Sequence, residues 1–153
     1  VAPSAYGGAG TVAMLACNCS AHRPRTYSVP VWYLTVVIAP SNPIVSIGPL
    51  LAIDGVRAAV QARREDVVAV SPLVGGRALK GPADRLMREL GHDDSVVGVA
   101  RLYAPVAGTL VVDQQDAAHA DAVRAAGLRC VVTDTIMRDP GAAAALCEAA
   151  LAR

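Results

Sequence analysis

Two stretches of the chain combine small polar residues, glycine and proline in a pattern suited to binding a phosphate. The first is Pro40–Pro49, with the sequence PSNPIVSIGP. Ser41, Asn42 and Ser46 lie there beside a predicted helix start, where free backbone N–H groups favour an anion. Gly48 would let a ligand approach the backbone closely. The alternative is that Asn42 and Ser46 are helix caps and nothing more.

The second stretch, Ser71–Pro82, has the sequence SPLVGGRALKGP. Gly75 and Gly76 precede Arg77 and Lys80, which is the only lysine of the chain, and a predicted helix follows. Glycine and cations before a helix suit phosphate binding. The pattern is not a Walker A loop, because neither Ser nor Thr follows the lysine. The alternative is a solvated basic loop, since Lys and Arg are mostly exposed.

A third polar stretch, Thr133–Asp139, directly follows a predicted strand. Asp134 is a candidate ligand there, whereas Asp139 is better explained as the N-cap of the last helix. The pair Asp84 and Arg88, at i and i+4, predicts a structural contact on a helix surface.

No motif of the chain identifies a catalytic residue or a metal site. The sequence has no Ser-His-Asp order, no HExxH and no GxGxxG. Cys17, Cys19 and His22 do not have a standard zinc spacing, and no second pair completes them. Cys130 and Cys147 lie in apolar runs, which favours buried small side chains over ligands or disulfide partners.

Strands and helices alternate along the chain from about residue 36, and they would position these stretches. The predicted strands are Thr35–Ala39, Val67–Val70, Thr109–Val112 and Leu128–Val132. The predicted helices are two short ones within Pro49–Gln61, the second capped by Asp54, and others that begin near Pro82, Ser95, Asp116 and Asp139. In the helix after Pro82, the apolar face would be Ala83, Leu86, Met87 and Leu90.

These strands are continuous apolar runs, which favours a parallel sheet covered on both faces. The predicted fold class is therefore α/β, a three-layer Rossmann-like parallel sheet. In such folds ligands bind at the carboxyl ends of the strands. This rule selects three loops: Pro40–Gly48, Ser71–Gly81 and Thr133–Asp139.

Composition limits the class of protein. The chain has 153 residues, a net charge of +1 and 54% hydrophobic residues. Those values exclude intrinsic disorder and a strongly basic nucleic-acid binder. The apolar run Val31–Ala39 is too short to span a membrane, which takes about 20 residues. No positive region precedes an apolar one near Val1, so no secretory signal is supported and the cytoplasm is the expected compartment.

Charge and aromatic residues are unevenly distributed. All 13 carboxylates lie at or after Asp54, and four of the five aromatic residues fall within the first 33 positions. This asymmetry predicts two parts: an irregular, unrelated or mis-framed segment over 1–35, and an α/β segment over 36–153. A wrong reading frame, a mispredicted start or a truncated gene would each explain the first part.

Four pieces of the second part resemble the C-terminal part of the 2-phospho-L-lactate transferase family of coenzyme F-420 biosynthesis. They are VVIAPSNPIVSIGPLLAIDGVRAAV, VVAVSPLVGGRALKGPADRLMRELG, GVARLYA and VVTDTIMRDP. The patterns SNPxxSIGP and SPxxGGxALKGPAD are far more specific than a lone glycine loop. The resemblance implies an incomplete Rossmann-like sheet, the C-terminal half of the family fold.

The resemblance also implies a reaction. Such enzymes transfer a phospholactyl or related phosphoenolpyruvyl group from a guanosine-diphosphate-activated donor to the hydroxyl of deazariboflavin (Fo); GMP leaves and Mg²⁺ assists. By resemblance, Ser41, Asn42, Ser46 and Gly48 lie near the phosphates of the nucleotide. The donor side would be completed by Gly75, Gly76, Arg77 and Lys80. By the same resemblance, the Mg²⁺ ligands are expected in the missing N-terminal half of the family fold, because residues 1–35 hold no carboxylate.

Other expectations follow from the same resemblance. The partners would be small molecules, neither nucleic acid nor membrane, and a homodimer is expected. If the chain is an incomplete copy, it should have weak or no transferase activity by itself. One alternative is a nucleotide-sugar-binding regulator of the same fold, although its first loop resembles GPGS rather than the Ser41-Asn42-Pro43 found here. The other is a non-functional fragment with an exposed sheet edge.

Overall fold

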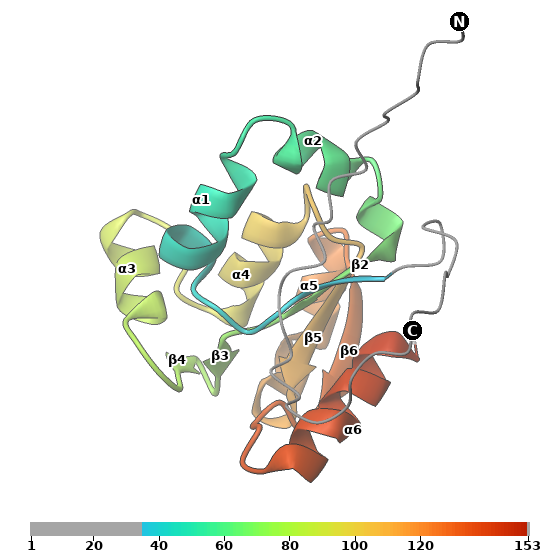
Figure 1. The fold of residues 1–153 in the computed structure, drawn as a ribbon. Coiled ribbons are helices and arrows are strands. Elements are labelled where there is room, and N and C mark those ends of the chain that lie inside the picture. Colours follow the sequence, from blue (N-terminus) through green and yellow to red (C-terminus); the bar gives the residue numbers. More distant parts are fainter. Residues whose placement is uncertain (1–34, 153) are drawn as a thin grey trace, which may run out of the picture.

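The computed structural model describes residues 35–152 and contains a four-stranded parallel sheet with helices on both faces (Figure 1). The predicted segment 1–35 lies outside the described residues apart from Thr35, as do Cys17, Cys19 and His22. The strand order is β1-β2-β5-β6, with β1 (Val36–Ile38), β2 (Val67–Val70), β5 (Thr109–Asp113) and β6 (Arg129–Thr133). All three neighbouring pairs are parallel. The predicted α/β class and its strands are confirmed.

Helices and short turns connect the strands. The α-helices are α1 (Gly48–Leu51), α2 (Val56–Gln61), α3 (Ala83–Glu89), α4 (Val96–Tyr103), α5 (Ala120–Ala125) and α6 (Pro140–Leu151). A π-helical turn, η2 (Pro43–Ile47), follows β1, and two 3₁₀ turns are η3 (Arg64–Asp66) and η4 (Gln114–His119). A small antiparallel hairpin, β3 (Leu73–Val74) and β4 (Arg77–Ala78), follows β2.

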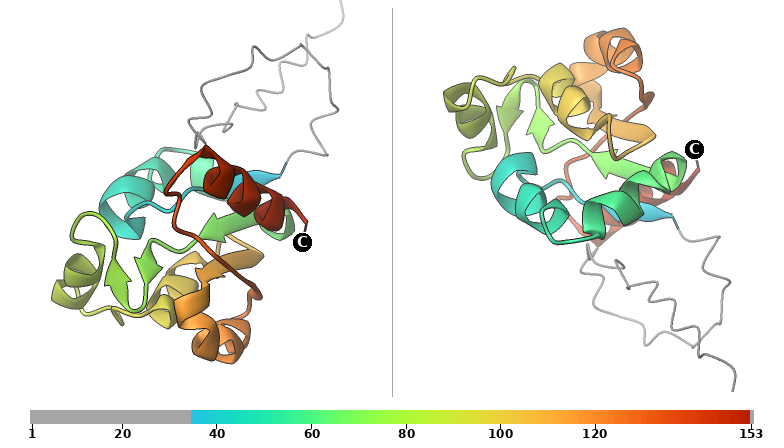
Figure 2. Two further views of the ribbon diagram at one scale, coloured as in Figure 1. Left: turned by 90° about the horizontal axis from the view of Figure 1, so that it is seen from below. Right: turned by 90° about the horizontal axis from the view of Figure 1, so that it is seen from above.

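Side chains alternate along the strands and divide the core between the two faces of the sheet. Ala69 and Leu110 point to the face that carries Val60 of α2, Met87 of α3 and Val99 of α4. The side chains that point the opposite way pack on α6 instead: Val68, Val70 and Val111 contact Leu146 and Ala150. Figure 2 shows α6 and α5 on opposite sides of the sheet.

The connections therefore change sides at one place. The connections after β1, β2 and β5 all place their helices on the face of α4 and α5, whereas the connection after β6 leads to α6 on the other face. Since β5 and β6 are neighbours, the connections that leave their carboxyl ends run toward opposite faces of the sheet. In open α/β sheets this arrangement is the topological switch point, beside which ligands bind.

Arg64 links three turns at the opposite, amino edge of the sheet. Its Nε donates to the carbonyl oxygen of Ala104 at 2.7 Å, and one Nη donates to the carbonyl oxygen of Gly127. The other Nη pairs with Glu65 at 2.6 Å. Ala104 and Gly127 precede β5 and β6 respectively, so one guanidinium fixes the starts of both strands to the turn that precedes β2.

Two buried hydroxyls, those of Tyr103 and Thr109, have no hydrogen-bond partner within the described residues. Desolvation raises the pKa of the Tyr103 phenol. Tyr103 and Thr109 are thus core residues whose polar atoms contribute nothing favourable to stability.

Several local predictions need correction. Helix α2 begins at Val56 after Gly55, whose φ of +79° ends the preceding turn, so Asp54 is not the cap. Leu90 is exposed because α3 ends at Glu89. Arg88 pairs with Asp94 rather than with Asp84.

The helix predicted from Asp116 is also different: it starts as the 3₁₀ turn η4, capped by Asp113. In the described residues no helix is both long and apolar enough to cross a membrane.

Candidate functional site

The parallel sheet brings the carboxyl ends of its strands to one edge, and the three predicted loops all start there, after β1, β2 and β6. A fourth connection, after β5, starts at the same edge and was not selected from the sequence. We call these four connections the edge loops. Each predicted site residue lies on one of them or on the turn that directly follows it.

Asn42 begins the turn after β1, and the oxygen and nitrogen atoms of its side-chain amide have different surroundings. Its Oδ1 accepts hydrogen bonds from the backbone N–H groups of Ile44, at 2.9 Å, and Val45, at 3.2 Å. The cap predicted for Asn42 is therefore confirmed. Its Nδ2 is buried and has no hydrogen-bond partner within the described residues. A buried N–H donor left unpaired is costly, so this nitrogen is the atom of the loop for which the described residues supply no acceptor.

The other predicted residues of this loop are less engaged. Ser41 is half-buried, and its backbone N–H donates to the carbonyl oxygen of Ala39 at 2.7 Å. Ser46 is exposed and caps no helix, because the residue before α1 is Ile47. A Cβ on Gly48 would lie 3.3 Å from the carbonyl oxygen of Pro43, so glycine allows the close turn between η2 and α1.

The glycine-rich stretch after β2, predicted as a loop, contains a short β-hairpin. Val74 pairs with Arg77, and the two glycines between them have φ of +58° (Gly75) and +75° (Gly76). Two successive positive φ values are typical of a type I′ turn, which side chains other than Gly, Asn or Asp rarely adopt. The hairpin sets the position of Arg77 at the sheet edge.

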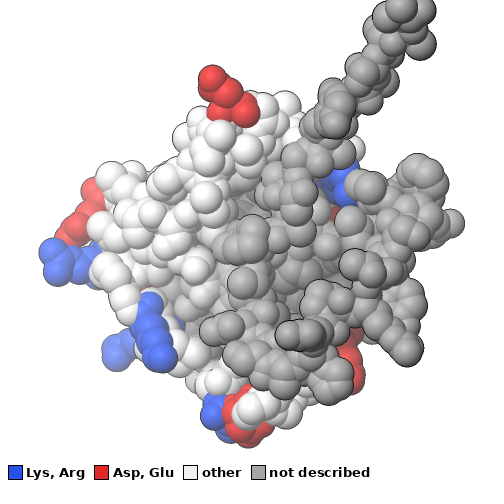
Figure 3. Space-filling model, viewed as in Figure 1, with Lys and Arg blue, Asp and Glu red and all other residues white. Residues whose placement is uncertain are grey.

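Arg77 and Lys80 are exposed, and within the described residues neither side chain forms an ion pair or hydrogen bond, although the Arg77 backbone pairs with Val74. Figure 3 shows basic side chains over α3 and the hairpin, whereas the surface over α1 is mostly uncharged. The exposure of these two cations agrees both with the predicted phosphate site and with the alternative of a solvated basic loop.

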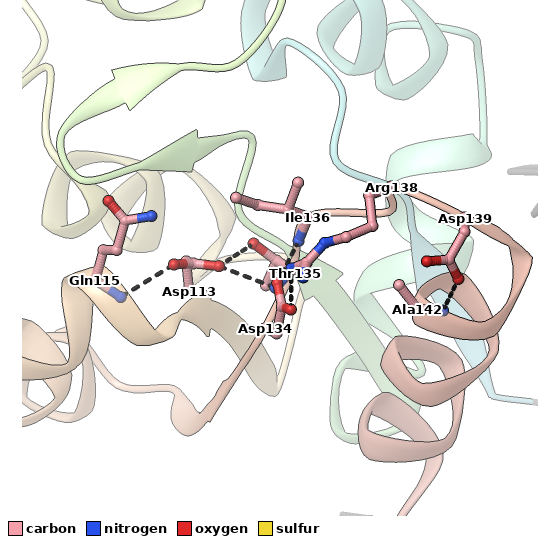
Figure 4. A network of polar contacts seen from close by, with 8 residues as sticks. All are labelled: Asp113, Gln115, Asp134, Thr135, Ile136, Arg138, Asp139 and Ala142. Carbon is pink, nitrogen blue, oxygen red and sulfur yellow. Dashed lines mark hydrogen bonds and ion pairs between the residues drawn. The ribbon is translucent and has the colours of Figure 1, made fainter.

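The loop after β6 holds its own acidic groups in local contacts. Asp134 accepts a hydrogen bond from the backbone N–H of Ile136 at 3.0 Å and pairs with Arg138 (Figure 4). Asp139 caps α6 by accepting from the backbone N–H of Ala142 at 2.8 Å, which confirms the predicted cap. The carboxylate of Asp134 is therefore engaged with a cation rather than free to bind one.

Asp113, at the end of β5, is the most extensively bonded side chain of the edge. Its Oδ2 accepts from the backbone N–H of Thr135 at 2.9 Å and from the Thr135 hydroxyl at 3.0 Å, while its Oδ1 accepts from the backbone N–H of Gln115 at 3.0 Å (Figure 4). Burial raises the pKa of Asp113, but the hydrogen bonds from Gln115 and Thr135 and the charge of Arg138 outweigh burial, so the pKa lies below its ordinary value. Asp113 is thus a buried, ionised carboxylate at the switch point.

Asp116 makes the corresponding contact on the other side of β5. This buried carboxylate accepts from the backbone N–H of Gly75 at 3.0 Å. A Cβ on Gly75 would lie 3.0 Å from Oε1 of Gln115, so the turn of the hairpin packs closely on η4. Sequence reasoning missed Asp113, Asp116 and Thr135. The available signal was their position directly after two adjacent strands.

Metal and nucleophile chemistry find little support in the described residues. Within 35–152, no three His, Cys, Asp or Glu side chains lie together. His92 and His119 are exposed. Cys130 and Cys147 are half-buried and form no disulfide. Burial is the main cause that raises the pKa of the Cys130 thiol, which makes it a poor nucleophile.

Together these features define an α/β protein of Rossmann-like type whose candidate site lies at the carboxyl edge of a parallel sheet. A family model described as "2-phospho-L-lactate transferase CofD" matches residues 34–148. The match includes all four edge loops and most of α6. The chain therefore belongs to the 2-phospho-L-lactate transferase family.

Individual relatives agree with this assignment. The chain is 40% identical over 119 residues to a phosphoenolpyruvate transferase of Streptomyces griseus, a match that covers 76% of the chain and 37% of the relative. It is 41% identical over 103 residues to a 2-phospho-L-lactate transferase of Methanocaldococcus jannaschii, covering 67% of the chain and 32% of the relative. A phosphoenolpyruvate transferase of Mycolicibacterium smegmatis is 34% identical over 116 residues. The chain spans about a third of the length of these relatives.

Proposed function

We propose that the chain takes part in transferring a phospholactyl or phosphoenolpyruvyl group from a guanosine-diphosphate-activated donor to deazariboflavin Fo, in coenzyme F-420 biosynthesis. In this reaction an oxygen of the Fo hydroxyl attacks the phosphorus that bears the three-carbon acid. The P–O bond to the GMP phosphate breaks, GMP leaves, and the hydroxyl proton is released. Which three-carbon acid is transferred is left open by the names of the relatives, which include both kinds of transferase.

The observation that carries the proposal is the unpaired Nδ2 of Asn42 at the carboxyl edge. It is a buried donor in a loop that belongs to the matched family segment, and a phosphate oxygen would satisfy it. Arg77 and Lys80, which have no anionic partner within the described residues, would neutralise the negative charge that develops on the leaving GMP phosphate. Ser41, Ser46, Gly48 and Gly76 would line the same donor side.

We include Mg²⁺ in the proposed reaction and in its assay, because the family resemblance implies that the ion assists the transfer. The described residues do not fit a Mg²⁺ site: no three acidic or His/Cys side chains cluster, and Asp113 is already satisfied by three donors. Asp134 is likewise paired with Arg138. We therefore derive no step through the ion. A homodimer, absence of nucleic-acid and membrane partners, and a cytoplasmic location belong to the same proposal.

The test is GDP binding by calorimetry, with Asn42→Asp as the critical variant. Aspartate caps a helix as well as asparagine does but has no N–H to donate. We expect the variant to keep its unfolding midpoint and to lose about tenfold or more in GDP affinity, because a donor is replaced by a negative charge. Gln61→Glu makes the same amide-to-carboxylate change on the exposed surface of α2 and should bind GDP like the wild type.

Two results would count against the proposal. One is wild-type affinity in Asn42→Asp; the other is tight binding of a UDP-sugar with no binding of GDP, which would favour the regulator of the same fold. Transfer itself is tested by mixing the chain with Fo, the activated donor and Mg²⁺ and separating the products by HPLC.

A further inference from the structure

Two buried carboxylates, Asp113 at the end of β5 and Asp116 in the η4 turn after it, each bind a different neighbouring edge loop. Asp116 accepts from the backbone N–H of Gly75, on the hairpin that follows β2. Asp113 accepts two hydrogen bonds from Thr135, in the loop that follows β6. Strand β5 lies between β2 and β6 in the sheet, so the acids extend from the middle strand to the loop on each side.

These contacts join parts of the chain that are far apart in sequence, and the one to Thr135 lies beyond Thr133, where the pairing of β5 with β6 ends. Gly75 and Asp116 are separated by 41 positions, and Asp113 and Thr135 by 22. The hairpin is only two residues long on each strand, and residues 134–139, between β6 and α6, form no helix or strand. Each loop is thus hydrogen-bonded to the side chain of one of the two carboxylates.

We propose that Asp113 and Asp116 are positioning residues for the candidate site. Asp116 fixes the position of the hairpin and hence that of Arg77. Arg77 lies two positions after Gly75 and pairs with Val74 across the hairpin. Asp113 sets Thr135 and hence the Asp134–Arg138 pair at the switch point. Neither acid needs to touch the ligand, because each acts through the loop that it holds. This inference rests on the proposed function for the identity of the ligand.

The chemistry of the contacts explains why carboxylates occupy these positions. Backbone N–H groups and a hydroxyl point at Asp113, and an ionised carboxylate accepts from all of them at once. In Asp113→Asn, the amide would place N–H donors against the N–H and O–H donors of Thr135 or Gln115. One acceptor site would be lost and one donor left unpaired, although the volume of the side chain would hardly change.

The first measurement is amide hydrogen exchange on the full chain without ligand. In Asp113→Asn we expect the amides of Gln115 and Thr135 to exchange about tenfold faster, and in Asp116→Asn the amide of Gly75, while β2 and β5 exchange as in the wild type. The matched control is Asp121→Asn, since Asp121 is exposed on α5 and its ion pair within residues 35–152 is with Arg124. Equal acceleration throughout the sheet, or none at all, would overturn the inference.

The second measurement is GDP affinity at a temperature where every variant is folded. We expect Asp113→Asn and Asp116→Asn each to weaken GDP binding by about tenfold to a hundredfold, because a misplaced loop loses its contacts to the ligand. Thr135→Val should weaken binding in the same direction as Asp113→Asn, and Thr135→Ser, which keeps the hydroxyl, should restore it. Faster loop exchange with wild-type affinity would refute a positioning role.

The two proposals fail in different ways. If the wild-type chain binds no GDP, the proposed function loses its support, and the exchange of the Gly75 and Thr135 amides alone decides whether the acids hold the loops. If the wild type binds GDP and the acid variants bind equally well, the positioning role is wrong while the proposed function stands. Should Asp113→Asn fail to fold, Thr135→Val removes only one of the three hydrogen bonds and carries the same test.

Discussion

Replacing Arg64 by alanine would remove the group that fixes three turns at the amino edge of the sheet. Arg64 donates to the carbonyl oxygens of Ala104 and Gly127 and pairs with Glu65. The turns that carry these carbonyls precede β5 and β6. Alanine at position 64 leaves both carbonyl oxygens without their charged donor and removes the apolar stem that covers the turn.

The size of the effect follows from these contacts. A hydrogen bond from a charged donor contributes about 1.5–3 kcal/mol when buried, and the Arg64 side chain is 31% exposed, so we take about 1–1.5 kcal/mol for each carbonyl. The pair with Glu65 adds little, roughly 0–0.5 kcal/mol, because the Glu65 side chain is 76% exposed. The free energy of unfolding should fall by about 2–3.5 kcal/mol, which corresponds to a Tm lower by roughly 5–12 °C.

Urea unfolding followed by far-UV circular dichroism measures this loss. Arg85→Ala is the matched control: Arg85 is 74% exposed on α3, makes only an i,i+4 pair with Glu89, and should cost less than about 0.5 kcal/mol. If the two variants unfold at the same urea concentration, the contacts of Arg64 do not stabilise the fold and the reasoning is wrong.

Three further predictions concern single atoms in the core and at the sheet edge. Gly98→Ala should lower the free energy of unfolding by about 3 kcal/mol or more, because a Cβ there would lie 1.7 Å from the carbonyl oxygen of Asp93; a loss under about 1 kcal/mol in urea would contradict this. Thr109→Val should be neutral or stabilising by up to about 1 kcal/mol, since it replaces a buried hydroxyl that has no partner in the described residues; clear destabilisation in the same assay would reveal an unseen partner. The lowered pKa of Asp113 stabilises the native state above about pH 4, and this contribution is lost as the pH falls through the native-state pKa; in Asp113→Asn, acid titrations followed by circular dichroism should therefore show a smaller loss of stability below about pH 4.

Much of the sheet could be predicted because its signal is local. Val67–Val70 is an unbroken run of buried residues between a polar turn and Ser71, and its predicted bounds are those of β2. The caps of α4 and α6 were equally accessible, since Ser95 and Asp139 each precede a helical pattern and accept from its first N–H groups. Apolar runs and helix caps can be predicted because they depend only on residues that are close together in the sequence.

The contacts of the candidate site were less accessible because they depend on the sheet order. The sequence marks Asn42 as a cap, but only the packing around it reveals the unpaired Nδ2. Nothing near Asp116 in sequence indicates that it meets Gly75, and the Gly75-Gly76 turn fixed a hairpin where only a loop was expected. Asp113 was overlooked because an acid that ends a strand resembles any turn residue until the neighbouring strand is known.

The order of the strands has a consequence for how the chain acquires its structure during synthesis. Each strand of the described sheet pairs with the one laid down before it: Val67 with Val36, Thr109 with Val68, and Arg129 with Thr109. No strand of this sheet has to be inserted between two that are already paired. As the ribosome releases the chain from its N-terminal end, the sheet can therefore grow by accretion, with each new strand finding an edge already in place. The last addition would be β6 with α6: β6 would pair with the free edge of β5, and α6 would cover the second face of the sheet.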